Sequence, residues 1–413
     1  MRCGNRHVTG LTVASLLVVA GSLLSTALAA SSGPITLGLL APMTGSRSDL
    51  GKGMEQGAQL ALDEINAAGG VLGRKVILKV QDSAADPADA VPGAQALINV
   101  YHAAAIIGPT AITDGVVLPL VDKANIPNLM FGGGGEFDKA SDPHFFRVSP
   151  SDSEQADAMA VYAHTKGWDK IALAFGSSGG SQSLVPPLLA AAKKLGMTVV
   201  ANVTLTAGQS SYRSELQRIF QNHPQVVVAQ FNNTTAGVIF GEVQQMGFGS
   251  TPWVASNLWF TSTFVKSVGS SAAAGPIYVT NSSSTGMVGA KEFMTLLKQK
   301  LNMTTPANGM EFMYDAAMSW ALGADKAGTL AMPAVRQGIL DTSKPPGTVV
   351  GDYATGLKLI KQGQAINYQG SASTLDYDQY DNVYGPFAIL HYASGQWTTL
   401  KTLTPQSIQQ ALQ

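Results

Sequence analysis

The sequence predicts an α/β protein made of two doubly wound sheets. Short apolar runs alternate with amphipathic segments along most of the chain, which is the pattern of parallel strands connected by helices. The alternation ends near Pro150 and then begins again, and 413 residues are more than one hydrophobic core usually holds. Sheets of this kind bind their ligands at the carboxyl ends of the strands.

The first strand-helix-strand unit is predicted within residues 35–83. An apolar run at 35–40 is followed by proline and glycine, as expected for a buried strand that enters a loop. A helix follows, because apolar residues then recur at helical spacing while polar residues fill the opposite face. Gly69 and Gly70 supply a left-handed stop for that helix, and the second strand is expected at 76–80.

The same alternation continues through the rest of the first sheet. Helices are expected at 88–100 and 115–124, strands at 104–107 and 126–131, and a turn at Gly108-Pro109. The segment 145–150 ends this sheet.

The second sheet begins after Pro150. Its expected helices are at 153–166, 182–195, 214–222 and 236–246, and its expected strands at 170–175, 198–203, 226–231 and 253–255. Beyond these, the sequence predicts a strand at 276–280, helices at 290–301, 310–327 and 333–340, and a final pair of strands at 384–392 and 396–403 around a Ser394-Gly395 turn.

Composition and motifs exclude several classes of function. The formal net charge is -1 and lysine and arginine form no run, so nothing attracts the chain to nucleic acid. The six histidines are scattered without an H-E-x-x-H motif, and no G-x-x-x-x-G-K-[ST] motif occurs. We therefore expect neither a resident metal nor a bound nucleotide, and no cofactor.

The first 29 residues have the features of an export signal. Arg2 and Arg6 form a basic start, the stretch 11–24 is mostly apolar, and 27–29 fits the small-x-small cleavage pattern. The apolar run is shorter than the roughly 20 residues of a membrane-spanning helix. Cleavage is predicted after about Ala29, and the mature protein is expected to be exported.

Seven short stretches match one known family in order, and they cover nearly all of the expected mature chain. They are LGLLAPMTG at 37–45, GAQLALDEINAAGGVLG at 57–73, DSAADP at 82–87, IIGP at 106–109, IP at 126–127, FRVSPSDS at 146–153 and NYQGSASTLDYD at 367–378. In these stretches the chain resembles the periplasmic solute-binding proteins of the branched-chain amino acid (Leu/Ile/Val) receptor family, the type I periplasmic binding proteins of ABC transporters.

The resemblance implies two lobes that close on a ligand, joined by a hinge of three crossover strands. Lobe one is expected at 34–150 plus 281–377, and lobe two at 151–280 plus 378–413. It also implies a binding protein rather than an enzyme, a monomer, and recognition of the closed form by ABC permease subunits in the inner membrane. A sensory role, in which the closed form contacts a receptor, is the alternative.

The family's ligand positions can be carried over onto this sequence. The turn that binds the ligand's carboxylate falls on Thr110, Ala111, Ile112 and Thr113. The position after the fourth strand, which holds the ligand's ammonium group, falls on the glycine run that includes Gly132, Gly133 and Gly134. The family's acidic partner for that ammonium falls on Asn257, and a neutral amide cannot replace a carboxylate there.

The side chains expected to line the binding cleft also differ from the family pattern. The aromatic positions of the family fall on Leu50 and near Gly180, whereas Phe231, Asn232, Trp259 and Tyr314 are candidates for the walls. Together with the absent acid, these changes predict a larger or aromatic carboxylate as ligand. The alternative is structural, with the aromatic residues in the core, Thr110 and Thr113 as helix caps, and the glycine run as a turn. Arg147 is expected in a structural ion pair near the hinge.

A serine hydrolase is a further alternative. Residues 176–180 satisfy the G-x-S-x-G pattern between a predicted strand and helix, which would make Ser178 a nucleophile. Asp352 and His391 follow in the order expected for a catalytic triad. However, His391 lies in a predicted strand, whereas the histidine of such enzymes lies on a loop.

Overall fold

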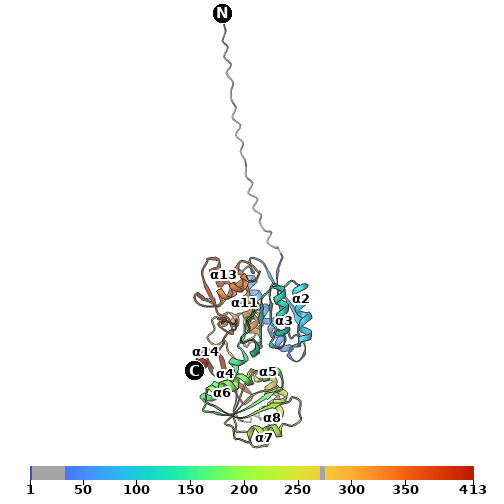
Figure 1. Ribbon diagram of the computed structural model, residues 1–413, viewed down its shortest axis with the longest axis vertical. Coiled ribbons are helices and arrows are strands. Elements are labelled where there is room, and N and C mark those ends of the chain that lie inside the picture. Colours follow the sequence, from blue (N-terminus) through green and yellow to red (C-terminus); the bar gives the residue numbers. More distant parts are fainter. Residues whose placement is uncertain (2–32, 270–274) are drawn as a thin grey trace. The chain divides into compact units, whose positions relative to one another are not determined.

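Five parallel strands form the first sheet, in the order β2-β1-β3-β4-β5. Figure 1 draws this part of the chain in blue to green. The computed structural model describes Met1 and residues 33–269 and 275–413, so the predicted signal segment and its cleavage point lie outside the described residues. The strands are β1 (Ile35–Ala41), β2 (Val76–Asp82), β3 (Ile106–Ile107), β4 (Asn128–Met130) and β5 (Phe145–Arg147). They are connected by α1 (Ser48–Ala67), α2 (Pro87–Asn99) and α3 (Ala111–Ala124). This confirms the predicted α/β class.

The close packing of helix α1 explains why it contains a glycine in its middle. It lies against α11 (Met310–Ala327), and a side chain at Gly57 would place its Cβ 1.9 Å from the backbone oxygen of Met310. Glycine is therefore required at this contact between the two helices. As predicted, the helix ends at glycines with positive φ, 109° at Gly69 and 76° at Gly70.

Seven strands form the second sheet, in the order β14-β13-β10-β9-β8-β6-β7. They are β6 (Lys170–Gly176), β7 (Thr198–Leu205), β8 (Val226–Gln230), β9 (Trp253–Ala255), β10 (Ile277–Ser282), β13 (Phe387–Ala393) and β14 (Gln396–Leu403). The helices that precede and connect the strands from β6 to β10 are α4 (Asp152–Thr165), α5 (Gly179–Gln182), α6 (Val185–Lys194), α7 (Arg213–Phe220), α8 (Asn233–Gln245) and α9 (Ser262–Val268), with a 3-10 turn η3 (Asn257–Trp259). β13 and β14 pair antiparallel, which confirms the predicted final pair of strands.

The chain passes between the two sheets three times. It leaves the first sheet after β5, returns after β10 to form α10 (Ala290–Leu301), α11 and α12 (Ala334–Thr342), and crosses again between β12 (Ile366–Tyr368) and β13. Three crossings between two doubly wound sheets agree with the predicted fold class. The exact limits of the two lobes stay a prediction.

A buried carboxylate holds the third crossing segment in place. Asp315 on α11 accepts hydrogen bonds from the backbone amides of Ser371 and Ala372, at 2.6 and 2.9 Å, and from the Ser371 hydroxyl. Burial raises the pKa of Asp315 to about 7. The side chain thus fastens this crossing to α11, a largely buried helix of the first sheet's core.

Some elements differ from the expectation. The small parallel sheet of β11 (Thr348–Val350) and β12 was not predicted, and neither were α9, α13 (Tyr353–Lys361) and α14 (Pro405–Ala411). The helix expected from residue 115 begins at Ala111 instead, because Thr110 is its N-cap. In the described part of the chain, no helix is long and apolar enough to cross a membrane.

Candidate functional site

The carboxyl end of β3 leads directly into α3 through Thr110. The Thr110 amide donates a hydrogen bond to the Thr113 Oγ1, at 3.0 Å, and the Thr113 hydroxyl donates to the Thr110 carbonyl, at 3.2 Å. Both residues are buried, at 3% and 0% exposure. The two threonines therefore cap the helix, as the structural alternative predicted.

Capping leaves the first two amides of α3 without a partner among the residues that the structure describes. The amides of Thr113 and Asp114 both donate to the Thr110 carbonyl, whereas those of Ala111 and Ile112 donate to no residue that the structure describes. Unpaired amides at a helix N-terminus, together with the helix dipole, attract an anionic group. The resemblance to the family places the carboxylate site on residues 110–113, which include both of these amides.

The glycine run lies beside this helix start. The Gly132 amide donates to the Ser149 Oγ, at 3.1 Å, and a Cβ at Gly132 would lie 2.4 Å from the backbone nitrogen of Ala111. Two sequence-predicted parts of the site, residues 110–113 and the glycine run, are therefore brought together. Only a glycine lets β4 end this close to the amides of α3.

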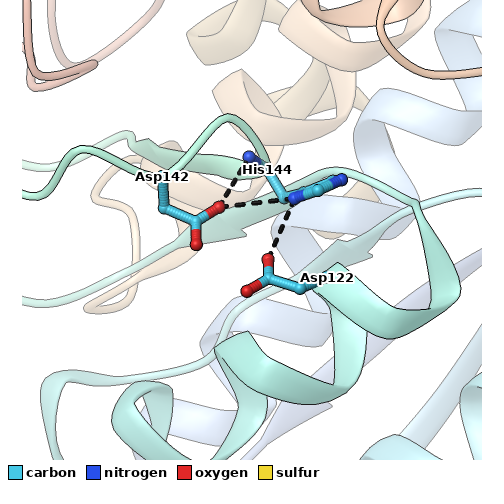
Figure 2. Close-up of side chains that lie close together, drawn as sticks. All are labelled: Asp122, Asp142 and His144. Atoms are coloured by element: carbon cyan, nitrogen blue, oxygen red, sulfur yellow. Dashed lines mark hydrogen bonds and ion pairs between the residues drawn. The ribbon is translucent and has the colours of Figure 1, made fainter.

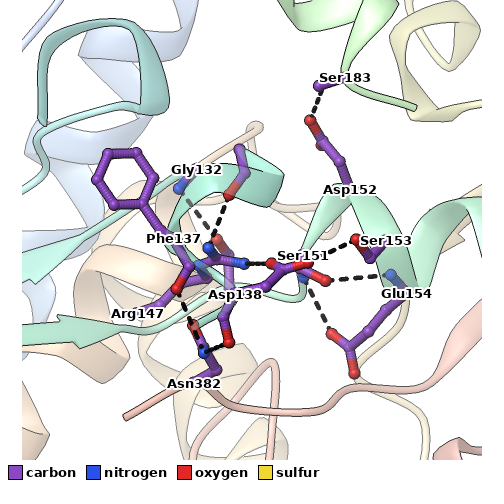
Figure 3. Close-up of polar contacts among 12 residues, drawn as sticks. Gly132, Phe137, Asp138, Arg147, Ser151, Asp152, Ser153, Glu154, Ser183 and Asn382 are labelled. Atoms are coloured by element: carbon purple, nitrogen blue, oxygen red, sulfur yellow. Dashed lines mark hydrogen bonds and ion pairs between the residues drawn. The ribbon is translucent and has the colours of Figure 1, made fainter. Parts of the chain in front are cut away.

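Arg147 stabilises the later part of the glycine run through hydrogen bonds (Figure 3). Its guanidinium donates to Asp138 Oδ1 and to the Gly134 carbonyl, both at 2.8 Å, and its side chain is 0% exposed. Asp138 also accepts from the Ser153 hydroxyl and, through its carbonyl, from the Asn382 amide group. This confirms the predicted structural pair, which joins the glycine run to the first and third crossing segments.

Asp152, the first residue of α4, was not identified from the sequence. Its backbone amide donates to the Gly133 carbonyl at 2.6 Å, and a Cβ at Gly133 would lie 1.9 Å from its Oδ1. The Oδ1 atom of Asp152 therefore lies against Gly133. Because the two residues are 19 positions apart, only the turn of the chain into α4 brings them together, and no spacing in the sequence indicates this contact.

The predicted ligand-binding residues that follow strands of the second sheet lie either in the core or at the starts of helical turns. Phe231 and Trp259 are 1% and 0% exposed, their rings lie 4.8 Å apart, and the Trp259 indole donates to the Phe231 carbonyl. Asn232 is exposed and caps α8, accepting from the Thr235 amide. Asn257 is partly exposed at the start of η3. The two aromatic residues thus present no open face here.

Tyr314 is also buried in the core. Its hydroxyl donates a hydrogen bond to Glu64 on α1, and its ring packs against Phe293. Burial raises the pKa of Glu64 to about 6, although its bonds to Tyr314 and to the Tyr353 amide oppose that shift. Tyr314 therefore connects α1 to α11, and its part in lining a cleft stays a prediction.

The three residues of the hydrolase alternative have separate structural partners. The Ser178 hydroxyl donates to Ser181, Asp352 caps α13 by accepting from the Thr355 amide, and the His391 ring stacks on Tyr278 at 5.0 Å. Among the described residues, none of the three hydrogen-bonds to either of the others. This arrangement does not form a catalytic triad.

One group of side chains has the types needed to hold a metal ion. His144 Nδ1 lies 2.9 Å from Asp122 Oδ1 and 3.4 Å from Asp142 Oδ1, as Figure 2 shows. Asp142 also accepts from the His144 amide, at 2.8 Å. Burial and the neighbouring Asp142 raise the pKa of Asp122. These contacts link the end of α3 to the loop before β5 without requiring an ion.

A surface groove of about 610 Å³ lies between α1 and β2, away from the predicted positions. Three of its polar side chains bond within the groove, since Asn66 bonds to both backbone groups of Val76 and Gln59 donates to Asp63. The groove contains none of the residues predicted to bind the ligand. The polar groups around α3 and the glycine run are therefore the better candidate site.

Comparison with known proteins agrees with this architecture. The Leu/Ile/Val-binding protein BraC3 of Rhizobium johnstonii is 26% identical over 329 residues, which cover 78% of this chain and 87% of that protein. The chemotactic signal transduction system substrate-binding protein BasB of Halobacterium salinarum is 25% identical over 366 residues, covering 83% of each chain.

Solved structures show the same fold. The leucine-binding protein LivK of Thermotoga maritima has a TM-score of 0.73 and 19% identity, covering 90% of this chain and 99% of that one. Residues 34–371 match the family model described as periplasmic binding protein. The chain therefore belongs to the periplasmic binding protein family, with the type I fold of the Leu/Ile/Val-binding proteins.

Proposed function

We propose that this protein is the extracytoplasmic solute-binding component of an ABC importer and that it captures a small carboxylate-bearing ligand. The family and the relatives named above are substrate-binding proteins, which supports a binding role rather than catalysis. The observation that carries the proposal is the pair of unpaired amides, Ala111 and Ile112, at the start of α3 beside Gly132.

A carboxylate suits this position for a physical reason. Two amide donors that point out of a helix N-terminus can each bond one carboxylate oxygen, and the helix dipole adds a further attraction of about 0.3–1 kcal/mol. Thr110 and Thr113 satisfy one another, so they hold the amides in place. In this proposal the threonines orient the site and the backbone binds the ligand.

Recognition of the loaded protein by the permease would follow from closure of the two lobes. We propose lobe one at 34–150 plus 281–377 and lobe two at 151–280 plus 378–413, with the three crossing segments as hinge. A ligand held by both lobes shifts the population toward the closed form, which the permease subunits recognise. The mature protein acts as a monomer in the periplasm after cleavage near Ala29.

Two ligand classes fit a carboxylate site. The name of BraC3 gives leucine, isoleucine and valine for that relative. The replacement of the family's acid by Asn257 favours instead a larger or aromatic carboxylate for this chain. Both classes carry the carboxylate that the amides of α3 would bind, so the proposal covers both.

Sensing is the second candidate role. The relative BasB, similar along 83% of its length, is named as part of a chemotactic signal transduction system. Ligand capture and closure would be the same in that role, and only the partner of the closed form would differ. A pull-down of ligand-loaded protein with the candidate permease, compared with a candidate receptor, separates the two roles.

A thermal-shift screen tests the proposed function. Residues 30–413, refolded to remove bound ligand, are screened against amino acids, aromatic acids, short aliphatic carboxylates, the matching amides, and sugars. A ligand at 100 times its dissociation constant adds about 2.7 kcal/mol to the free energy of unfolding, a readily visible shift. We expect a carboxylate to raise the midpoint and its amide to have no effect. Stabilisation by sugars or amides alone would contradict the proposal.

A further inference from the structure

We propose that Asp122, Asp142 and His144 form a binding site for a divalent transition-metal ion, and that zinc is the ion that suits them best. The cluster joins the last turn of α3 to the loop before β5. It lies at the opposite end of α3 from residues 110–113, roughly 17 Å further along the helix at 1.5 Å per residue. The site is therefore separate from the proposed carboxylate site and does not depend on it.

The three ligand atoms are spaced like ligands around one metal ion. His144 Nδ1 lies 2.9 Å from Asp122 Oδ1 and 3.4 Å from Asp142 Oδ1, and all three atoms lie within 4.8 Å of one another (Figure 2). Ligands that bind zinc at about 2.0–2.2 Å are about 3.0–3.5 Å apart in tetrahedral or octahedral geometry. The side chains are 13%, 37% and 23% exposed, for His144, Asp122 and Asp142, so an ion can enter from solvent.

The direction of His144 Nδ1 differs from that in an ordinary ion pair. His144 Nδ1 and Asp122 Oδ1 are both shielded from solvent, and neither has a hydrogen-bond partner among the described residues, although they are only 2.9 Å apart. Nδ1 therefore points directly at neither carboxylate. The pair His164–Asp169 is different, because its Nδ1 and Oδ1 form a hydrogen bond of 2.6 Å. Paired side chains point at one another, whereas metal ligands direct their lone pairs at a common point between them.

The second ring nitrogen of His144 is held by the end of α3. Nε2 lies 3.1 Å from Oδ1 of Asn125, the C-cap of that helix. Because an amide oxygen only accepts hydrogen bonds, Nε2 carries a proton, and the lone pair of the neutral ring is then on Nδ1. Metal-binding histidines have this arrangement, in which the second nitrogen donates to an oxygen that fixes the ring.

The charges of the cluster also favour a divalent cation. Within the described ranges, His144 is the only basic side chain in an ion pair with Asp122 or Asp142. Burial and the neighbouring Asp142 raise the pKa of Asp122, so the two carboxylates lack full compensation. A protonated His144 compensates one carboxylate, whereas a divalent ion compensates both. One imidazole nitrogen with two carboxylate oxygens suits zinc, while calcium and magnesium prefer oxygen ligands alone.

Calorimetry with zinc chloride and with calcium chloride tests the site. Residues 30–413, without an affinity tag and dialysed against a chelator that is then removed, are compared as wild type, His144→Gln, Asp122→Asn and His164→Gln. His164→Gln is the matched control, because His164 also pairs with an aspartate but has no third ligand. We expect one zinc ion per chain in the wild type and the control, and at least about tenfold weaker binding in His144→Gln and Asp122→Asn. Calcium should bind the wild type at least about tenfold more weakly than zinc.

Thermal unfolding of the same proteins separates loss of the ion from loss of the fold. Zinc at 100 times its wild-type dissociation constant should raise the midpoint of the wild type and of His164→Gln by several degrees, and should leave His144→Gln and Asp122→Asn unchanged. A cooperative transition without zinc shows that each variant is folded. The inference is overturned if the wild type binds no zinc, if either folded variant binds zinc as tightly as the wild type, or if calcium binds as tightly as zinc.

Discussion

Two groups of predicted binding residues differ in what they offer to a ligand. One lies around α3 at the end of the first sheet, and the other is the aromatic cluster of the second sheet. Around α3, the amides of Ala111 and Ile112 have no partner among the described residues, and only glycine fits at position 132 beside them. In the second sheet, Trp259 packs among rings at 4.8 to 6.2 Å and uses its indole hydrogen within the core. Backbone groups, more than large side chains, are therefore available to a ligand here.

The largest expected effect is on stability, from the aromatic cluster. We expect Trp259→Ala to lower the free energy of unfolding by about 3–5 kcal/mol, because it leaves a cavity among four rings. Urea denaturation measures this loss. If Trp259 is only core, ligand affinity of the protein that remains folded should change less than twofold. A loss of affinity above about 1 kcal/mol with little loss of stability would make Trp259 a wall of the site instead.

A slightly smaller loss of stability is expected for substitutions of Arg147, beside the glycine run. Arg147→Met should cost about 3 kcal/mol of unfolding free energy, because Asp138 and the Gly134 carbonyl lose a buried charged donor. Arg147→Lys should cost less, since one ammonium keeps the charge but cannot reach both acceptors with the same geometry. Equal stability of the methionine variant and the wild type, measured by urea denaturation, would show that this ion pair does not hold the glycine run.

A weaker effect should appear as a pH dependence of stability. The pKa of Glu64 is about 6 in the folded protein against 4.5 for the free side chain, so the folded state binds more protons between these values. Its contribution to the free energy of unfolding therefore decreases as the pH rises from about 4.5 to 6, by at most about 2 kcal/mol. Glu64→Gln should remove this part of the slope in denaturation curves.

Asp49→Asn, an exposed position at the start of the same helix, is the control and should leave the slope unchanged. If both variants keep the wild-type slope, burial of Glu64 beside Tyr314 does not affect its protonation. The hydrogen bond from Tyr314 to Glu64 would then stabilise the packing of α1 on α11 less than the structure indicates.

Much of the fold was predictable because its elements carry strong local patterns. The strand at 253–255 and the helices at 290–301 and 310–327 agree with the predictions to the residue. The two helices show apolar residues at helical spacing, and glycines flank the second at both ends. The three-residue strands β11 and β12 are too short to show a period, and β11 is largely exposed, so neither strand was predicted.

The candidate site was predictable only in part. Residues 110–113 and the glycine run follow two neighbouring strands, so their meeting at one end of the sheet follows from the order of the elements. Asp152 was missed because its contact with Gly133 depends on the path of the chain into α4. Phe231 and Trp259 were expected as walls, but aromatic residues at strand ends serve a core as readily as a ligand.

The most direct test of a ligand site at α3 is a pair of glycine substitutions on the same part of the chain. Gly132→Ala places a methyl group at the Ala111 amide, whereas Gly115→Ala, on α3 itself, extends into open space. Calorimetry with the carboxylate that gives the largest thermal shift compares both variants with the wild type. We expect Gly132→Ala to weaken binding at least about tenfold and Gly115→Ala to leave it unchanged. Wild-type affinity in a folded Gly132→Ala protein would contradict the account.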